Sequence, residues 1–237
     1  MQRQLDLSIL RQPDDTTCGP TSLHAVYAYY GDDVALDQVI KEVPRLPHGG
    51  TLAVHLGCHA LARGYRVRLW SYNLQVMDPT WFTRPGIDLA ERLRERRDAR
   101  EGKRLRASCD AYLEFLRRGG EVVFEDLTPE LVQSHLQRDV PVLAGLSSTY
   151  LYRAMREVGP DDDDVRGDPQ GHFVVVYGYS AGGRLVHVAD PLGSSPLHRG
   201  EHKYHVSADR LVCAILLGVL TYDGNLLVVE PAEDRAG

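Results

Sequence analysis

The chain has 237 residues, of which 43% are hydrophobic and 25% charged, a composition typical of a globular protein with one substantial core. Its net charge of −6 excludes a nucleic-acid-binding protein of the usual basic kind, because phosphate binding requires a surface rich in lysine and arginine. No segment approaches the roughly 18 consecutive apolar residues of a membrane span, and the N-terminus has no apolar signal core. We therefore expect a single domain over 1–237, in the cytoplasm and without a membrane partner.

The segment 12–22 contains a cysteine immediately before a predicted helix. The first backbone N–H groups of a helix have no internal partner, and the helix dipole places partial positive charge there, so a thiolate at Cys18 is stabilised. We interpret Gly19 as leaving room for a substrate carbonyl to approach the backbone, and Pro20 as pre-setting the first helical turn. The apolar side chains that follow predict one packed helix over 21–30.

Short helices and a strand follow. A helix is predicted over 36–43, and a second one, capped by Thr51, ends near residue 62. Alternating apolar side chains predict a strand over 65–70. Proline and glycine predict a loop over 78–87.

Residues 88–118 change in composition, and strongly charged helices are predicted over 88–97 and 112–118. We interpret this charge as that of a solvated, salt-bridged helix pair rather than a binding surface. The segment separates two groups of motifs described below. We therefore interpret about 78–120 as a charged helical insertion, placed to act as a lid or an interface.

The C-terminal half mixes strands and helices. Thr128 and Pro129 are typical of a helix start, and the turn at 222–225 is typical of a hairpin. The predicted elements are a strand over 121–124, a helix ending near 137, a buried strand over 140–146, an acidic surface loop over 157–168 and a hairpin over 211–229.

A further predicted hairpin carries a histidine and an aspartate. The run 171–179 is rich in β-branched and aromatic residues, with His172 near its start, and 184–189 forms the second strand. With a four-residue turn at 180–183, Asp190 falls beside the start of the first strand, next to the histidine. An imidazole flanked by a carboxylate is the arrangement that a thiol–imidazole pair requires.

Four linked motifs in this chain resemble those of the papain-like cysteine peptidases of the C39 and C39-like group. They are Gln12, Cys18-Gly19-Pro20, Gly171-His172-Phe173 and Asp190-Pro191. The resemblance covers roughly 8–70 and 128–195. It implies an α+β papain-like fold, in which a helical part with the nucleophile helix packs on an antiparallel β-sheet, with a cleft between the two.

The resemblance also implies a role for each motif residue. Cys18 attacks a peptide or amide carbonyl, and His172 takes the thiol proton and later gives it to the leaving group. Asp190 fixes the tautomer of the imidazole. Gln12 stabilises the oxyanion together with the backbone N–H of Cys18. The reaction passes through a thioester and needs no cofactor.

Three functions compete on these residues. We favour a cytoplasmic cysteine peptidase or amidase that acts on a peptide or amide substrate. An acyltransferase or transglutaminase-like enzyme would use the same thioester with an amine acceptor. A non-catalytic peptide-binding module is the third, although the intact Cys18, His172 and Asp190 argue against it.

We interpret two other groups of possible metal ligands as structural residues. Two groups contain possible ligands, namely His55, Cys58 and His59, and then His198, His202 and His205. The first lies among apolar residues that favour a core helix, and the second lacks a fourth ligand, so we expect no metal site.

The scattered spacing of the four cysteines predicts that Cys18, Cys58, Cys109 and Cys213 are free thiols. If the acidic loop borders the cleft, it favours cationic substrate groups.

Overall fold

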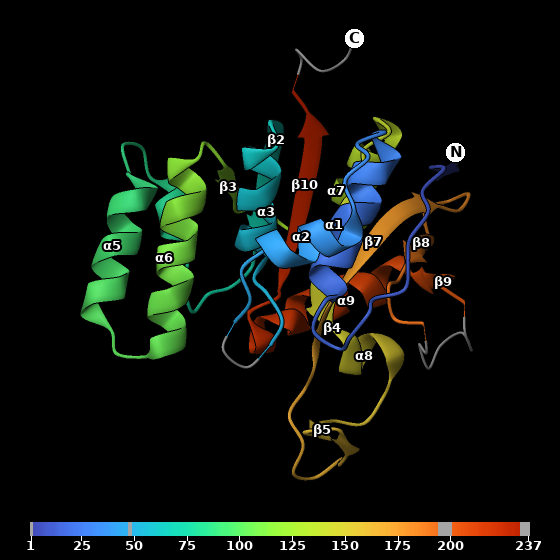
Figure 1. The fold of residues 1–237 in the computed structure, drawn as a ribbon. Coiled ribbons are helices and arrows are strands. Elements are labelled where there is room, and N and C mark those ends of the chain that lie inside the picture. The colour runs from blue at the N-terminus through green and yellow to red at the C-terminus, as the bar shows by residue number, and fades with distance from the viewer. Residues whose placement is uncertain (1, 47–48, 194–200, 233–237) are drawn as a thin grey trace.

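The chain folds around one large β-sheet in the computed structural model, which describes residues 2–46, 49–193 and 201–232 (Figure 1). Its strands are β1 (Arg3–Gln4), β2 (Tyr65–Ser71), β3 (Glu121–Val123), β4 (Val142–Ser147), β7 (Gly171–Tyr179), β8 (Leu185–Ala189), β9 (Lys203–Ser207) and β10 (Asn225–Pro231). Seven of them lie in the order β3-β2-β10-β4-β7-β8-β9, and β1 pairs with β7 outside this row. Neighbouring strands are antiparallel, except that β2 and β3 are parallel.

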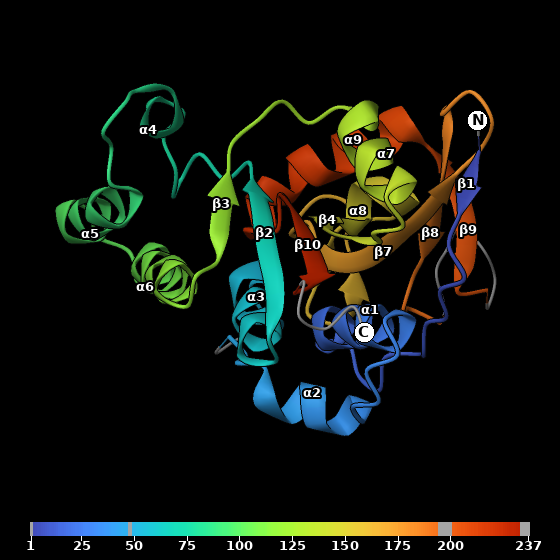
Figure 2. The ribbon, with the colours of Figure 1, turned by 90° about the horizontal axis from the view of Figure 1, so that it is seen from above.

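Helices cover both faces of the sheet (Figure 2). They are α1 (Cys18–Tyr29), α2 (Leu36–Glu42), α3 (Ala53–Ala62), α4 (Thr80–Thr83), α5 (Leu89–Ala99), α6 (Lys103–Arg117), α7 (Pro129–Gln137), α8 (Ser148–Tyr152) and α9 (Ala208–Leu217), with the 3-10 turn η1 (Gly218–Thr221) after α9. The layer of α1 to α3 covers one face, and α7 and α9 cover the other. No helix within the described ranges has both the length and the apolar character needed to cross a lipid bilayer.

The core lies between these layers, because the central strands are apolar on both faces. Every residue of β4 is buried, and Gly171 is the one residue of β7 that is partly exposed. Leu23 and Val26 of α1 are fully buried in the same core. Continuous apolar runs such as these are typical of strands that are covered on both sides.

The charged segment forms α4, α5 and α6 beyond β3, at the end of the sheet away from β7 (Figure 2). Arg97 of α5 forms an ion pair with Asp110 of α6 (2.9 Å), and Glu114 forms ion pairs with Arg117 and Arg118 at helical spacing. These contacts confirm the prediction of a salt-bridged helix pair. Each long helix also has an apolar anchor, since Leu93 of α5 and Phe115 of α6 are fully buried.

Two local predictions near the insertion are wrong. Thr51 does not cap α3, because Leu52 occupies the cap position and the Thr51 hydroxyl donates instead to the carbonyl of Pro44 (2.7 Å). The loop predicted over 78–87 contains the short helix α4, which Pro79 precedes.

The C-terminal hairpin predicted over 211–229 is also wrong. Leu211, Ala214 and Ile215 recur at helical spacing and are buried on one face of α9, so the first half of this segment is a helix and only the second half forms β10. The acidic loop predicted over 157–168 is exposed as expected, and it contains a small hairpin of β5 (Glu157–Val158) and β6 (Asp161–Asp162).

Candidate active site

The candidate nucleophile, Cys18, is the first residue of α1, as the sequence predicted. Thr17 precedes the helix, but its hydroxyl donates to the carbonyl of Asp14 (3.0 Å) and makes no cap with the helix. The first turn of α1 contains no acidic side chain either. The unpaired N–H groups and the positive end of the helix dipole therefore lie beside the Cys18 thiol without a competing anion from the first turn.

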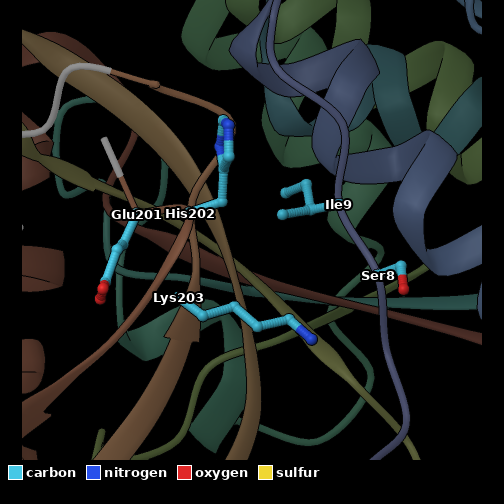
Figure 3. Close-up of a pocket in the computed structure, with 5 residues that line it drawn as sticks. All are labelled: Ser8, Ile9, Glu201, His202 and Lys203. Carbon is cyan, nitrogen blue, oxygen red and sulfur yellow. The ribbon is translucent and has the colours of Figure 1, made fainter.

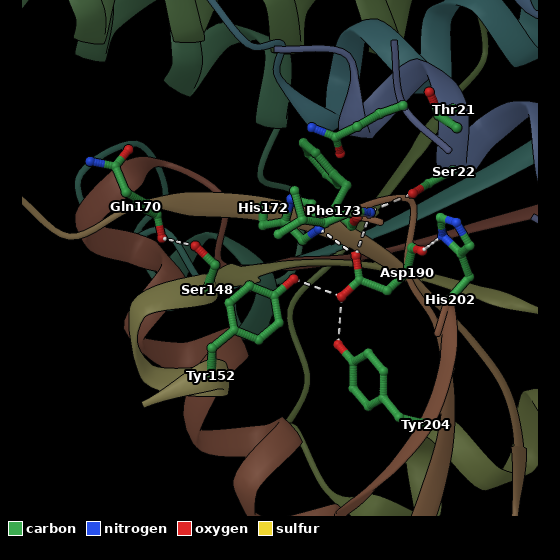
Figure 4. Close-up of polar contacts among 12 residues, drawn as sticks. Thr21, Ser22, Ser148, Tyr152, Gln170, His172, Phe173, Asp190, His202 and Tyr204 are labelled. Carbon is green, nitrogen blue, oxygen red and sulfur yellow. Dashed lines mark hydrogen bonds and ion pairs between the residues drawn. The ribbon is translucent and has the colours of Figure 1, made fainter. Parts of the chain in front are cut away.

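Two contacts fix α1 against the strand that carries His172. The Ser22 hydroxyl donates to the backbone carbonyl of Phe173 (3.2 Å; Figure 4). A Cβ atom at Gly19 would lie 2.7 Å from Thr51 Cγ2 and 3.2 Å from Phe173 Cδ2, so a side chain there would force the neighbours apart. The structure thus assigns this glycine to close helix–strand packing, whereas the sequence interpretation assigned it to substrate approach.

A β-bulge brings the histidine and the aspartate to the same face of the sheet. The register between β7 and β8 shifts by one residue between Val176 and Gly178. On the side of the shift that is nearer to His172, Val175 lies opposite Ala189. The next residue, Asp190, therefore lies on the face that carries His172. Without the extra residue the two side chains would point to opposite faces. As it is, Asp190 Oδ1 accepts a hydrogen bond of 2.9 Å from His172 Nε2.

Four donors surround the carboxylate of Asp190, which is fully buried (Figure 4). Oδ1 accepts hydrogen bonds from His172 Nε2 and from the backbone N–H of Leu192, both at 2.9 Å. Oδ2 accepts hydrogen bonds from the hydroxyls of Tyr152 and Tyr204, both at 2.6 Å. We call these two residues the tyrosine clamp. Because the clamp comes from α8 and β9, two separate elements hold one carboxylate in place.

The charges of the site reinforce one another. Burial opposes a positive charge on His172, yet the charges and hydrogen bonds of Asp190 and Cys18 raise the pKa of His172 to about 10. Burial also opposes ionisation of Asp190, but the charge of His172 and the hydrogen bonds from the histidine and the tyrosine clamp hold the pKa of Asp190 below its usual range. The imidazole therefore retains its proton near neutral pH, with Nε2 bonded to the carboxylate.

Gln12 is held next to the Asp190-Pro191 turn by its backbone, since its N–H donates to the carbonyl of Pro191 (2.9 Å). Its side chain is only 7% exposed. The side-chain Nε2 donates to the carbonyl of Asp14 (2.9 Å), and Oε1 is buried without a hydrogen-bond partner. An amide NH₂ group has two hydrogens, so the bond to Asp14 uses only one of the two donors of Gln12.

Little of the candidate site reaches solvent, since Cys18 is 8% and His172 6% exposed. A hollow of about 330 Å³ lies nearby, between the N-terminal segment and the start of β9 (Figure 3). It is lined by Ser8, Ile9, Glu201, His202 and Lys203. His202 connects it to the site, because its Nδ1 donates to the backbone carbonyl of Asp190 (2.8 Å). The lining of this hollow includes neither Cys18 nor His172.

A second buried carboxyl group, Asp223, lies against β7, the strand that carries His172. A Cβ atom at Gly171 would lie 1.8 Å from Asp223 Oδ2, so only glycine fits beside this carboxyl. Burial raises the pKa of Asp223 to about 7, although Thr221, Arg104 and His172 oppose the shift. The sequence prediction treated Asp223 as a turn residue only, because nothing in the local pattern indicates its burial.

Two of the histidines considered as metal ligands, His59 and His202, have other partners. His59 Nε2 bonds Glu42 (3.0 Å), and His202 bonds the Asp190 backbone as described above. His198 lies outside the described residues. In the part of the chain that the structure describes, no three histidine, cysteine, aspartate or glutamate side chains form a group that could hold a metal ion.

One family model matches most of the C-terminal half of the chain. Residues 110–208 match the Peptidase_C39 like family. The matched segment contains His172 and Asp190, whereas Gln12 and Cys18 precede it. No curated protein sequence matches the chain.

Solved peptidase structures are similar to the whole chain. A protein from Bacillus anthracis described as a C39-like peptidase has a TM-score of 0.54 at 12% identity, covering 98% of both chains. A double glycine motif protease from an AMS/PCAT transporter, in complex with the leader peptide, has a TM-score of 0.49 at 13% identity, covering 98% of this chain and 99% of that chain. The peptidase domain of Streptococcus ComA has a TM-score of 0.46 at 14% identity, covering 94% of this chain and 98% of that chain.

The family match and the Bacillus anthracis structure confirm the resemblance to C39-like peptidases and the α+β papain-like fold. Sequence reasoning missed Tyr152 and Tyr204, because neither belongs to a motif. Polar residues alternate with Tyr204 and Val206 along β9, and this pattern indicates that Tyr204 points inward, as the structure shows. No sequence signal indicates which group Tyr204 meets.

Proposed function

Given this resemblance, we propose that the chain is a cysteine peptidase that cleaves peptides with Cys18, His172 and Asp190. The observation that carries the proposal is the connected set of contacts from the thiol through the imidazole to a fully buried carboxylate. These groups come from segments far apart in the sequence, and they meet beside a helix N-terminus. A thiol in that setting has both a base and an electrostatic partner.

In the first half of the reaction, the sulfur of Cys18 attacks the carbonyl carbon of the peptide bond. The C–N bond breaks, and His172 gives its proton to the departing amine nitrogen. The acyl group remains on the sulfur as a thioester. Because the pKa of His172 is raised to about 10, the imidazole carries the required proton near neutral pH.

In the second half, a water molecule attacks the thioester carbon and His172 accepts one of the water protons. The C–S bond breaks, which releases a carboxylic acid whose proton passes to solvent, and which restores the free sulfur of Cys18 and the protonated imidazole. Asp190 stays ionised throughout and supports the positive charge on the imidazole, because four donors already satisfy its two oxygens.

The oxyanion that forms at the carbonyl oxygen requires hydrogen-bond donors. We assign this role to the backbone N–H of Cys18, at the uncapped start of α1, and to the remaining amide hydrogen of Gln12. Loss of one such donor typically lowers the rate by about a hundredfold to a thousandfold.

Hydrolysis can be tested directly with a mixed peptide library in ¹⁸O-labelled water, with and without an added primary amine. We expect new peptides that carry the label at their freshly formed C-termini, in amounts that the amine does not reduce. Water is then the acceptor, as in a peptidase.

The competing functions give different products in the same experiment. Amine-capped peptides without labelled carboxylates would replace the peptidase proposal by an acyltransferase. An unchanged library that nevertheless binds to the protein would replace it by a peptide-binding module.

A further inference from the structure

A second hollow of about 440 Å³ lies among α8, the end of β9 and the start of α9. Its lining is rich in hydrogen-bond donors and includes Tyr150, Arg153, Ser207 and Arg210. Cys18, His172 and Gln12 do not belong to this lining. The hollow is therefore separate from the site proposed for catalysis, and nothing proposed above uses it.

The charge and the buried N–H donors of Arg210 lack an acidic partner and hydrogen-bond acceptors among the described residues. Its Nε and Nη2 atoms are buried and have no hydrogen-bond partner, and it forms none of the ion pairs found among the described residues. Burial, together with the neighbouring charge of Arg153, lowers the pKa of Arg210. A guanidinium that is partly desolvated and lies near a second cation is costly unless an anion accompanies it.

Arg153 is fixed in this position by its backbone. It ends α8 in the left-handed conformation, with φ of 55°, and its N–H donates to the carbonyl of Tyr150 (3.3 Å). The left-handed conformation is strained for residues other than glycine or asparagine. Arg153 is exposed and has no acidic partner among the described residues, so its charge is free to act in the hollow.

One acidic residue, Asp209, lines the same hollow and has to be weighed against the arginines. It is exposed and lies in the first turn of α9, where the helix dipole stabilises a carboxylate. No ion pair joins it to Arg153 or Arg210 among the described residues, so both arginines remain available to another anion.

We propose that this hollow binds an oxyanion, the carboxylate or phosphate group of a small ligand, between Arg153 and Arg210. Guanidinium groups suit such ligands because their donors match pairs of oxygens. The Tyr150 and Ser207 hydroxyls of the lining can donate further hydrogen bonds. The volume exceeds that of a bare phosphate ion, so it accommodates the atoms to which the group is attached.

Binding can be measured by isothermal titration of the full chain with inorganic phosphate and, separately, with acetate, each against sodium chloride of equal ionic strength. The variants are Arg153→Gln, Arg210→Gln and, as a matched control, Arg94→Gln, an exposed arginine of α5. We expect saturable binding that weakens about tenfold or more in the first two variants and is unchanged in the control. Binding of phosphate alone identifies a phosphate site, and binding of both anions identifies a general oxyanion site.

The proposal is overturned if neither anion binds saturably to the unmodified chain, or if Arg153→Gln binds as tightly as the unmodified chain does. Because Arg153 is exposed, its substitution leaves the fold intact and decides the question even if Arg210→Gln does not fold. The measurement reads binding and not turnover, so its result is independent of the proposed peptidase activity.

Discussion

Replacing Cys18 by alanine is expected to abolish peptide hydrolysis while leaving the fold and its stability nearly unchanged. The substitution removes the atom that forms the thioester, and removal of a covalent nucleophile typically lowers kcat by about 10⁴-fold or more. The side chain is small and lies at the first residue of α1, so we expect the free energy of unfolding to change by no more than about 1 kcal/mol. Peptide cleavage followed by mass spectrometry and denaturant unfolding measure the two effects.

The other three cysteines supply controls, since all four are free thiols. Cys213 is exposed, and Cys213→Ala should keep full activity. Retention of a substantial fraction of the cleavage rate by Cys18→Ala, under conditions in which Cys213→Ala is fully active, would show that another group is the nucleophile.

Replacing Asp190 by alanine is expected to reduce both activity and stability. It leaves the His172 imidazolium and the hydroxyls of Tyr152 and Tyr204 buried without their acceptor. Removal of one partner from a buried charge pair typically costs about 3–5 kcal/mol of unfolding free energy. The rate should fall by about a hundredfold or more, because the imidazole loses the group that orients it.

Asp190→Asn is the matched control for this prediction. Its carbonyl oxygen can still accept the hydrogen bonds from His172 and Leu192, and the tyrosine hydroxyls can rotate to accept from its NH₂ group. We expect a smaller loss of stability than in Asp190→Ala. An alanine variant as stable as the asparagine variant would contradict the role of the tyrosine clamp as a donor pair.

The sign of the pH dependence follows from the same contacts. The pKa of Asp190 lies below its usual value of 3.8, so its ionised form stabilises the folded state above that pH. This contribution is lost as the pH falls below 3.8 through the lowered pKa. The stability difference between the unmodified chain and Asp190→Asn should therefore narrow in acid.

The sequence predicted those parts of the site whose signals are local. Cys18 at a helix start, and a strand over 171–179 with His172 near its beginning, both follow from neighbouring residue types, and the structure confirms both. Asp190 was expected beside the histidine from a simple hairpin, but the bulge after Val176 is what brings it to the correct face. A bulge depends on the pairing of two strands, and the residue types alone do not specify it.

The parts that were missed depend on contacts between distant segments. Tyr152 and Tyr204 meet Asp190 only after α8 and β9 are placed on either side of it. Asp223 is buried because Gly171 and its neighbours leave space for it. The turn at 222–225 has a strong hairpin pattern, which favours a strand before it, whereas Leu211, Ala214 and Ile215 recur at helical spacing and form one face of α9.

The reactivity of the Cys18 sulfur tests the proposed nucleophile most directly. The rate of iodoacetamide labelling of each cysteine, measured at neutral pH by peptide mass mapping in the unmodified chain and in His172→Ala, reports whether the imidazole activates this thiol. We expect Cys18 to react faster than exposed Cys213 and than Cys58, whose pKa burial raises to about 11. We also expect the His172→Ala substitution to remove that advantage. A Cys18 that reacts no faster than Cys213, or at a rate independent of His172, would contradict the assignment.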